Sequence, residues 1–223
     1  MLKLPNVTLA MANTDCPDMG IKTLLHCASL AKFGAVKMFS NIAAAPKPIE
    51  LIKVPALGME GYNNFMVLEL ARHINTDFVL TVQVDGFILN ADRWQDKFLT
   101  FDYVGAPWAL GLQKIHPQGT RVGNGGFCLR SKKFTELTAT LTDFNSAKMK
   151  GFEKAEDFYL CKTRHDYLRA RGMKFADLAT AADFSLEAPI AEQPRTYGDV
   201  FGFHGSPKHY PTQGFLDMVR RKY

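Results

Sequence analysis

The sequence lacks the cysteine patterns that mark metal sites and disulfide frameworks. Its 223 residues include only four cysteines, and none of them falls in a C-x-x-C pair. The four, Cys16, Cys27, Cys128 and Cys161, are far apart along the chain. We therefore expect no zinc site and no disulfide bonds, but reduced and mostly buried thiols, as is usual in a cytoplasmic protein.

Long apolar runs and blocks of like charge are also missing. No stretch approaches the roughly 20 apolar residues of a membrane span, and the N-terminus has no secretory signal pattern. The net charge is +5 and the pI is about 9.0, but the basic residues are scattered. These features predict a soluble protein that binds no nucleic acid. The positive balance suits an anionic small ligand, and the basic end MVRRKY could contact an anionic membrane surface, although a solvated tail is the simpler interpretation.

What the sequence does contain is an alternation of strand-like and helix-like segments. With 47% hydrophobic residues, the chain is expected to form one domain over residues 1–223. Apolar runs typical of strands lie at 7–14, 35–41, 49–55, 77–89, 102–108 and 125–131. Helical periodicity covers 21–34, 61–74, 133–144 and 153–172. This order predicts an α/β fold with a mostly parallel central sheet flanked by helices.

In the run 77–89, the first, apolar part ends in the sequence Gln-Val-Asp-Gly, at residues 83–86. Ligands of open α/β sheets collect at the carboxyl ends of the strands, where Asp85 is predicted to lie. Gln83 would point to the same side, and Gly86 allows a turn or a close approach of a ligand. A carboxylate there could hold a divalent cation that bridges a diphosphate. The alternative is that Asp85 only caps a turn.

Three later segments carry further polar candidates, each with a plain structural alternative. The glycine-rich segment 122–131 precedes a strand and lacks the lysine of a phosphate-binding loop, so it could be an ordinary turn. Glu156 and Asp157 could include a general base, or could simply stabilise the positive end of a helix dipole. His204, followed by Lys208, could contact a metal or a phosphate, or be an exposed loop histidine. The polar segment 109–124 is expected to be a loop, either a lid or a slack connection.

Taken together and in order, these segments resemble a known family. They are QVD at 83–85, DYVGAPW at 102–108, GNGGFCLR at 123–130, ED at 156–157 and FGFHG at 201–205. The set resembles glycosyltransferases of the GT-A type, and more closely a family of uncharacterised, glycosyltransferase-related domains. The similarity covers about residues 75 to 206.

The resemblance implies transfer of a sugar from a nucleotide-sugar to a hydroxyl acceptor, with inversion, as in polysaccharide biosynthesis. Asp157 would be the catalytic base, and Glu156 would bind acceptor hydroxyls. Asp85 would be the surviving acid of the D-x-D motif, and with His204 would hold a divalent cation, Mn²⁺ or Mg²⁺. Gln83 stands where the first aspartate of that motif would be, which puts the dependence on metal in question.

The resemblance also assigns residues to the two substrates. The donor side comprises Asn13, Thr14 and Asp15 at the base and ribose, with Gln83, Asp85, Gly86 and Lys208 near the diphosphate. The sugar and acceptor side comprises Asn124, Gly125 and Gly126, together with Trp108, whose ring could stack on a sugar or pack in the core.

Two other functions compete with this one. The protein could be a non-catalytic module of a polysaccharide assembly system that binds a nucleotide-sugar or a glycan, which the missing first aspartate favours. It could also be a nucleotidyltransferase on a similar scaffold. The segment NTDCPDMG, at 13–20, argues against the latter, because it has neither a glycine cluster nor a basic residue.

Overall fold

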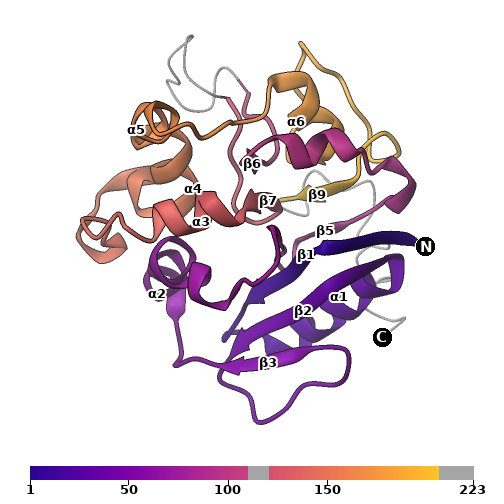
Figure 1. Ribbon diagram of the computed structural model, residues 1–223, viewed down its shortest axis with the longest axis vertical. Coiled ribbons are helices and arrows are strands. Elements are labelled where there is room, and N and C mark those ends of the chain that lie inside the picture. Colours follow the sequence, from indigo (N-terminus) through magenta and orange to yellow (C-terminus); the bar gives the residue numbers. More distant parts are fainter. Residues whose placement is uncertain (110–120, 206–223) are drawn as a thin grey trace.

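The computed structural model describes residues 1–109 and 121–205, and its centre is a six-stranded sheet. The strand order is β3-β2-β1-β4-β7-β6, running from the bottom of Figure 1 towards the top. The strands are β1 (Leu2–Ala12), β2 (Ala31–Ser40), β3 (Glu50–Lys53), β4 (Phe78–Thr81), β6 (Tyr103–Val104) and β7 (Cys128–Ser131). The first four pair in parallel, while β7 is antiparallel to both β4 and β6. The predicted mostly parallel sheet is therefore confirmed.

Helices cover both faces of this sheet. They are α1 (Pro17–Leu30), α2 (Gly58–Asn64), α3 (Lys132–Thr138), α4 (Glu156–Phe158), α5 (His165–Ala170) and α6 (Leu178–Phe184). Along β1, Leu9 and Met11 belong to the core cluster that contains Leu24 of α1. Ala10, which points to the opposite face, packs in a second cluster with Phe65, in the π-helical continuation of α2 at Phe65–Glu69. Burial on both faces explains why the strands lack a clean polar alternation.

The first helix ends earlier than the sequence predicted. Pro17 starts α1 at a position that tolerates a missing N–H, but the helix stops at Leu30 and β2 follows at once. Gly34, expected to end the helix, lies inside β2. A Cβ there would be 2.2 Å from the carbonyl oxygen of Pro5, where the pairing of β1 with β2 shifts register. The glycine thus serves a close approach of two strands.

The later predicted helices are shorter or interrupted. The Ser131 side chain caps α3 by accepting a hydrogen bond from the Phe134 N–H at 3.1 Å, and α3 ends at Thr138, well before residue 144. The predicted helix 153–172 is divided into α4, a π-helical turn at Tyr159–Thr163 and α5. Short 3₁₀ turns lie at Leu70–His73, Ala91–Arg93, Asp96–Thr100, Ser146–Lys148 and Gly151–Lys154.

A second, small sheet was not predicted. It consists of β5 (Gly86–Ile88), β9 (Gly202–His204) and β8 (Ser185–Leu186), in the order β5-β9-β8. Gly86 pairs with His204, and Leu186 pairs with Phe203. β5 follows β4 after a short turn at the carboxyl edge of the main sheet. By pairing with β5, β9 is brought next to this edge, although it lies more than a hundred positions later in the sequence.

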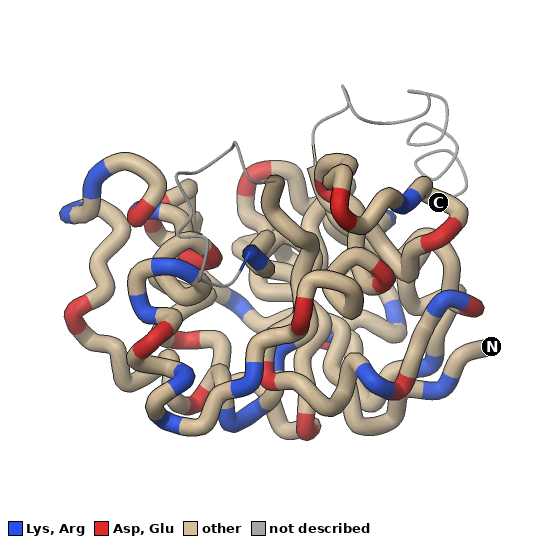
Figure 2. The backbone as a smooth tube through the Cα atoms, turned by 90° about the horizontal axis from the view of Figure 1, so that it is seen from above, with Lys and Arg blue, Asp and Glu red and all other residues tan. Residues whose placement is uncertain are grey.

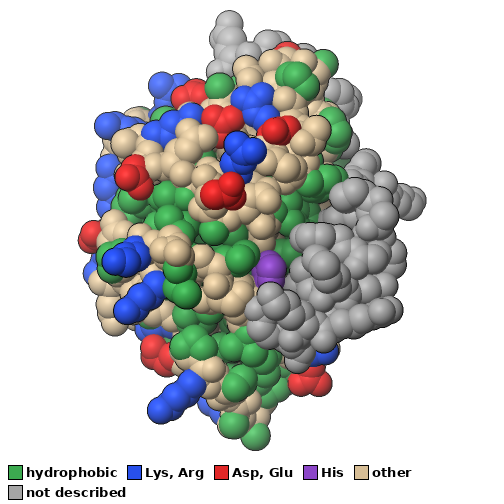
Figure 3. Space-filling model, turned by 90° about the vertical axis from the view of Figure 1, so that its right-hand side faces the viewer, with side chains coloured by type: hydrophobic (Ala, Val, Ile, Leu, Met, Phe, Trp, Pro, Cys, Tyr) green, Lys and Arg blue, Asp and Glu red, His purple; other side chains and the backbone are tan. Residues whose placement is uncertain are grey.

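Over the described residues, basic and acidic side chains are interspersed. Blue and red segments both occur throughout the tube in Figure 2, and charged and apolar side chains mix on the face shown in Figure 3. All four cysteines are free; Cys27, Cys128 and Cys161 are buried, as expected for most of the thiols, and Cys16 is exposed. In the part of the chain that the structure describes, no helix has the length and apolar character needed to cross a membrane.

Candidate functional site

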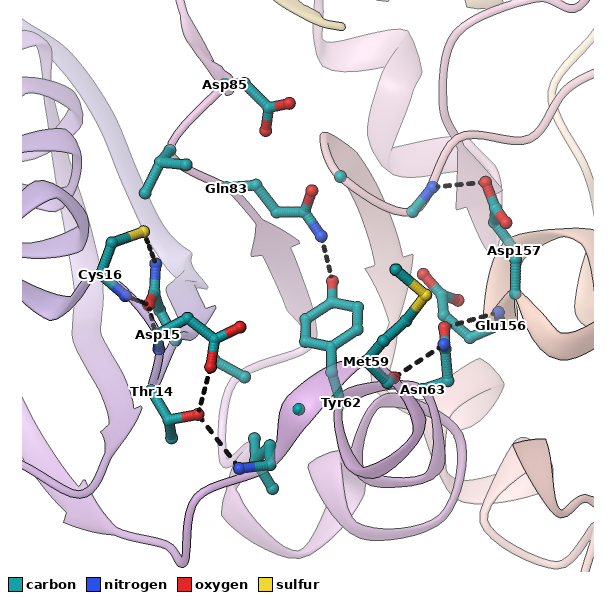
Figure 4. A pocket seen from close by; sticks show the side chains of 18 of the residues that line it. Thr14, Asp15, Cys16, Met59, Tyr62, Asn63, Gln83, Asp85, Glu156 and Asp157 are labelled. Carbon is teal, nitrogen blue, oxygen red and sulfur yellow. Dashed lines mark hydrogen bonds between the residues drawn. The ribbon is translucent and has the colours of Figure 1, made fainter. Parts of the chain in front are cut away.

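A cavity of about 410 Å³ opens at the carboxyl ends of β1 and β4. Six segments far apart in the sequence line it: the loop after β1, the start of α2, the turn after β4, the segments around Gly125 and Glu156 (Figure 4), and His204 at the end of β9. The lining residues are Ala12, Asn13, Thr14, Asp15, Cys16, Leu57, Gly58, Met59, Tyr62, Asn63, Gln83, Val84, Asp85, Gly125, Gly126, Ala155, Glu156, Asp157 and His204. Its volume is within the range typical of small-molecule sites, about 300 to 1,000 Å³.

The Gln-Val-Asp-Gly segment is a tight turn that joins the two sheets. The N–H of Gln83 donates to the carbonyl of Gly86 at 2.9 Å, and the N–H of Gly86 donates back to Gln83 at 3.0 Å. A Cβ on Gly86 would be 2.7 Å from the carbonyl oxygen of Gly126. A glycine is therefore required for the two segments to approach, and the turn presents the Asp85 carboxylate at the cavity.

Polar side chains form a connected row along one wall of the cavity. The Gln83 amide nitrogen donates to the Tyr62 hydroxyl at 2.7 Å, so its oxygen faces Nε2 of His204 at 3.1 Å (Figure 4 shows the first contact). The same Nε2 is 3.7 Å from the Asp85 carboxylate. Burial acts to lower the pKa of His204, but the carboxylates of Glu187 and Asp85 outweigh it and raise the pKa above its ordinary value. This row brings together the amide, the carboxylate and the imidazole that the sequence assigned to the donor and metal side.

The glycine pair at 125 and 126 lies between this row and the carboxylates of α4. The N–H of Gly125 donates to the Asp157 carboxylate at 3.1 Å. A Cβ on Gly125 would lie 1.5 Å from a carboxylate oxygen of Glu156, and one on Gly126 would lie 2.2 Å from the His204 ring. Both positions therefore require glycine, because a side chain at either one would clash with Glu156 or His204.

The two adjacent acids of α4 have different surroundings. Glu156 is 3% exposed, and its carboxylate accepts a hydrogen bond from the fully buried Arg130 at 2.8 Å. Burial raises the pKa of Glu156, an effect that Arg130 opposes and the neighbouring Asp157 reinforces. Asp157 is only half-buried. Both line the cavity, and Asp157 is the more accessible of the two carboxylates.

The loop after β1 is held in place by its own side chains. The Asn13 side-chain oxygen accepts hydrogen bonds from the N–H groups of Asp15 and Cys16, at 3.1 and 2.9 Å. The Thr14 hydroxyl accepts from the N–H of Leu57 at 3.0 Å, which joins this loop to the start of α2. All three predicted residues of this loop line the cavity, opposite the carboxylates of α4 (Figure 4).

Four predicted site residues are not among those that line the cavity. Trp108 is 7% exposed and packs against Gly123 and the Phe158 ring, so it is a core residue. Asn124 is 1% exposed and adopts φ 68°, and its side-chain oxygen accepts from the N–H of Gly126, which shapes the turn. Gly86 contributes its backbone to the turn beneath. Lys208, and most of the predicted loop 109–124, lie outside the described residues.

Sequence reasoning missed several residues that build the site. Tyr62 orients Gln83, and Asn63 accepts from the N–H of Glu156 at 3.0 Å, so α2 supports both polar sets. Glu187, at the end of β8, faces Nδ1 of His204 at 3.6 Å. Of these residues, only Arg130 could have been identified from the sequence, because an arginine within an apolar strand requires a buried carboxylate partner.

The potential metal ligands in the cavity wall fit a divalent cation that binds together with a phosphate group. Asp85, Gln83 and His204 offer one carboxylate oxygen, one amide oxygen and one imidazole nitrogen, which are ligands that Mn²⁺ accepts. No group of three or more His, Cys, Asp or Glu side chains that could hold a metal occurs within residues 1–109 and 121–205. The remaining coordination would therefore come from diphosphate oxygens and water. No lysine or arginine is among the described lining residues, so such a cation would supply charge that a diphosphate needs.

Comparison with solved structures identifies the fold. The chain is similar to an active-site mutant of LgtC, with a TM-score of 0.58 and 12% identity over 96% of this chain and 95% of LgtC. It is also similar to a glycosyltransferase involved in glycosylation of the major capsid of PBCV-1, with a TM-score of 0.53 and 13% identity, covering 96% and 98% of the two chains. The apo form of the glycosyltransferase GlyE of Streptococcus pneumoniae TIGR4 matches with a TM-score of 0.53 and 9% identity, over 97% of this chain and 59% of GlyE.

These likenesses confirm the predicted GT-A fold, and at such low identity they show the fold alone. No curated protein matches the sequence. A family model described as a protein of unknown function, DUF5672, matches residues 50–204, which include the turn after β4, the glycine pair, the acids of α4 and His204. The match covers more than half of the chain, and the protein therefore belongs to the DUF5672 family.

Proposed function

We propose that the protein is a glycosyltransferase that moves a sugar from a nucleotide-sugar donor to a hydroxyl acceptor with inversion. One observation carries the proposal: Asp85, His204 and Asp157, from three distant segments, line one cavity at the carboxyl edge of a GT-A sheet. The row of Gln83, Asp85 and His204 suits the diphosphate end of a donor. The half-buried Asp157, on the opposite side, suits the acceptor.

In the proposed reaction, the Asp157 carboxylate takes the proton of the acceptor hydroxyl. The hydroxyl oxygen forms a bond to the anomeric carbon as the bond from that carbon to the diphosphate oxygen breaks, and the electron pair leaves with the nucleoside diphosphate. The hydrogen bond from the N–H of Gly125 holds the carboxylate of Asp157 in place. Glu156, fixed by Arg130, forms the wall beside it and is proposed to contact acceptor hydroxyls.

The donor side would hold the nucleotide and the leaving group. Asn13, Thr14 and Asp15 are proposed to contact the base and ribose, since they line the cavity next to Asp85. Asp85, His204 and Gln83 would hold Mn²⁺ or Mg²⁺. When bound, the cation would neutralise the negative charge that develops on the departing diphosphate.

The experiment that tests the proposal compares Asp157→Asn with wild type. Asparagine can still accept the hydrogen bond from Gly125, so the fold and donor binding should persist while the base is lost. Positioned general-base catalysis is worth about a hundred- to ten-thousand-fold, so turnover should fall by at least about a hundredfold. Nucleoside diphosphate release from a panel of nucleotide-sugars gives the rate, and calorimetry gives the donor affinity.

A matched control is Asp166→Asn, because the Asp166 side chain on α5 is fully exposed and is not among the cavity-lining residues. Its turnover should equal that of wild type. Unchanged turnover in Asp157→Asn would show that Asp157 is not the base. Nucleotide-sugar binding by wild type without any transfer or hydrolysis would instead favour the non-catalytic binding module, which the amide at position 83 supports.

A further inference from the structure

Glu187 lies directly behind the histidine of the proposed cation site. β8 and β9 pair in parallel with Leu186 opposite Phe203, so Glu187, which directly follows β8, lies beside His204, the last residue of β9. The Glu187 carboxylate is 3.6 Å from Nδ1 of His204. Glu187 is not among the residues that line the cavity. Among the described residues of the site, its recorded contact is the one to the His204 imidazole.

The two ring nitrogens of His204 face different groups. Nε2 faces the cavity side, 3.1 Å from the Gln83 amide oxygen and 3.7 Å from the Asp85 carboxylate. Nδ1 is buried and makes no hydrogen bond to any described residue, since its 3.6 Å separation from the Glu187 carboxylate exceeds the usual limit of about 3.2 Å. A buried nitrogen without a partner costs free energy, and a shift of about 0.5 Å would give it a charged acceptor.

We propose that Glu187 is a positioning residue, which accepts a hydrogen bond from the Nδ1–H of His204 and so directs the Nε2 lone pair to a divalent cation. The inference rests on the proposed function, because that function supplies the cation. A histidine that binds metal through one nitrogen commonly donates its other N–H to a carboxylate, which fixes both the tautomer and the ring orientation. If a cation binds, the proton that Nε2 carries would leave to solvent, while the Nδ1 proton would remain on the ring, hydrogen-bonded to Glu187.

The test is a titration of the full-length protein with Mn²⁺, followed by electron paramagnetic resonance, with and without a nucleoside diphosphate. Loss of such a partner typically weakens metal binding about 10- to 100-fold, which is the effect expected for Glu187→Ala. Glu187→Gln keeps an acceptor oxygen and should weaken binding less. The control is Glu136→Gln on α3, where an exposed carboxylate only approaches Lys132 at 3.8 Å, and its affinity should match wild type.

The affinity and the number of sites distinguish positioning from a structural role. Poor orientation raises the Kd while each chain still binds one ion, whereas partial misfolding lowers the number of sites at an unchanged Kd. An affinity of Glu187→Ala within about twofold of wild type, or a loss of sites alone, would overturn the inference. So would a wild-type protein that binds nucleoside diphosphate but no Mn²⁺. The expected Mn²⁺ results without sugar transfer would refute the proposed function and leave the role of Glu187 standing.

Discussion

The buried ion pair between Arg130 and Glu156 gives the sharpest prediction about stability. The Arg130 side chain is 0% exposed and that of Glu156 is 4% exposed, and the two are joined at 2.8 Å. Removing one partner of such a pair leaves an uncompensated charge and costs about 3 to 5 kcal/mol. Arg130→Met should therefore destabilise the protein by that amount, which corresponds to a fall in Tm of roughly 6 to 20 °C for a chain of this size. Replacing both partners, in Arg130→Met with Glu156→Leu, should cost much less than the sum of the single changes.

Urea unfolding of the four proteins, followed by tryptophan fluorescence, measures the cycle. The pH dependence adds a second check on Arg130→Met. Burial raises the pKa of Glu156, and Arg130 opposes that rise, so the folded-state pKa climbs further when Arg130 is removed. A raised folded-state pKa means that the penalty is full above that pKa and fades as the pH falls and the carboxyl is protonated. A cost below about 1 kcal/mol, or costs that simply add, would refute the interpretation of this pair as mutually compensating charges.

Two further predictions concern the two ion pairs of Asp183 and the exposed thiol of Cys16. Burial acts to raise the pKa of Asp183, but hydrogen bonds from Lys97 and Arg195 hold it below its ordinary value. Asp183→Asn should cost about 1 to 3 kcal/mol at neutral pH, and the cost should fade as acid protonates Asp183 in wild type; an equal cost at about pH 3 in urea unfolding would contradict this. Cys16 lines the cavity while the other three cysteines are buried, so a thiol reagent should label one site rapidly, and saturating nucleoside diphosphate should slow that labelling. Labelling of Cys16 at the same rate with and without nucleotide would argue against a nucleotide beside the loop after β1.

The supports of the proposed site are where the sequence was least informative. Tyr62 lies on the predicted helix 61–74, but nothing in a helical pattern indicates that its hydroxyl orients Gln83. Glu187 precedes a proline-containing segment, and its local sequence predicts only an acidic residue at the surface. Its position behind His204 depends on two- and three-residue strands, which are too short to give a periodic signal.

Local sequence patterns were sufficient to predict the main sheet and the polar residues at the end of one of its strands. The apolar runs and helical periodicity of the first 90 residues indicate which side chains are buried. This burial pattern is enough to predict a mostly parallel sheet with Gln83 and Asp85 at a strand end. Only the tertiary structure decided that Arg130 neutralises Glu156, that Trp108 packs in the core, and that His204 pairs with Gly86. These contacts join residues 15 or more positions apart, and their energies depend on the burial and distance that folding creates, which no local pattern of residue types contains.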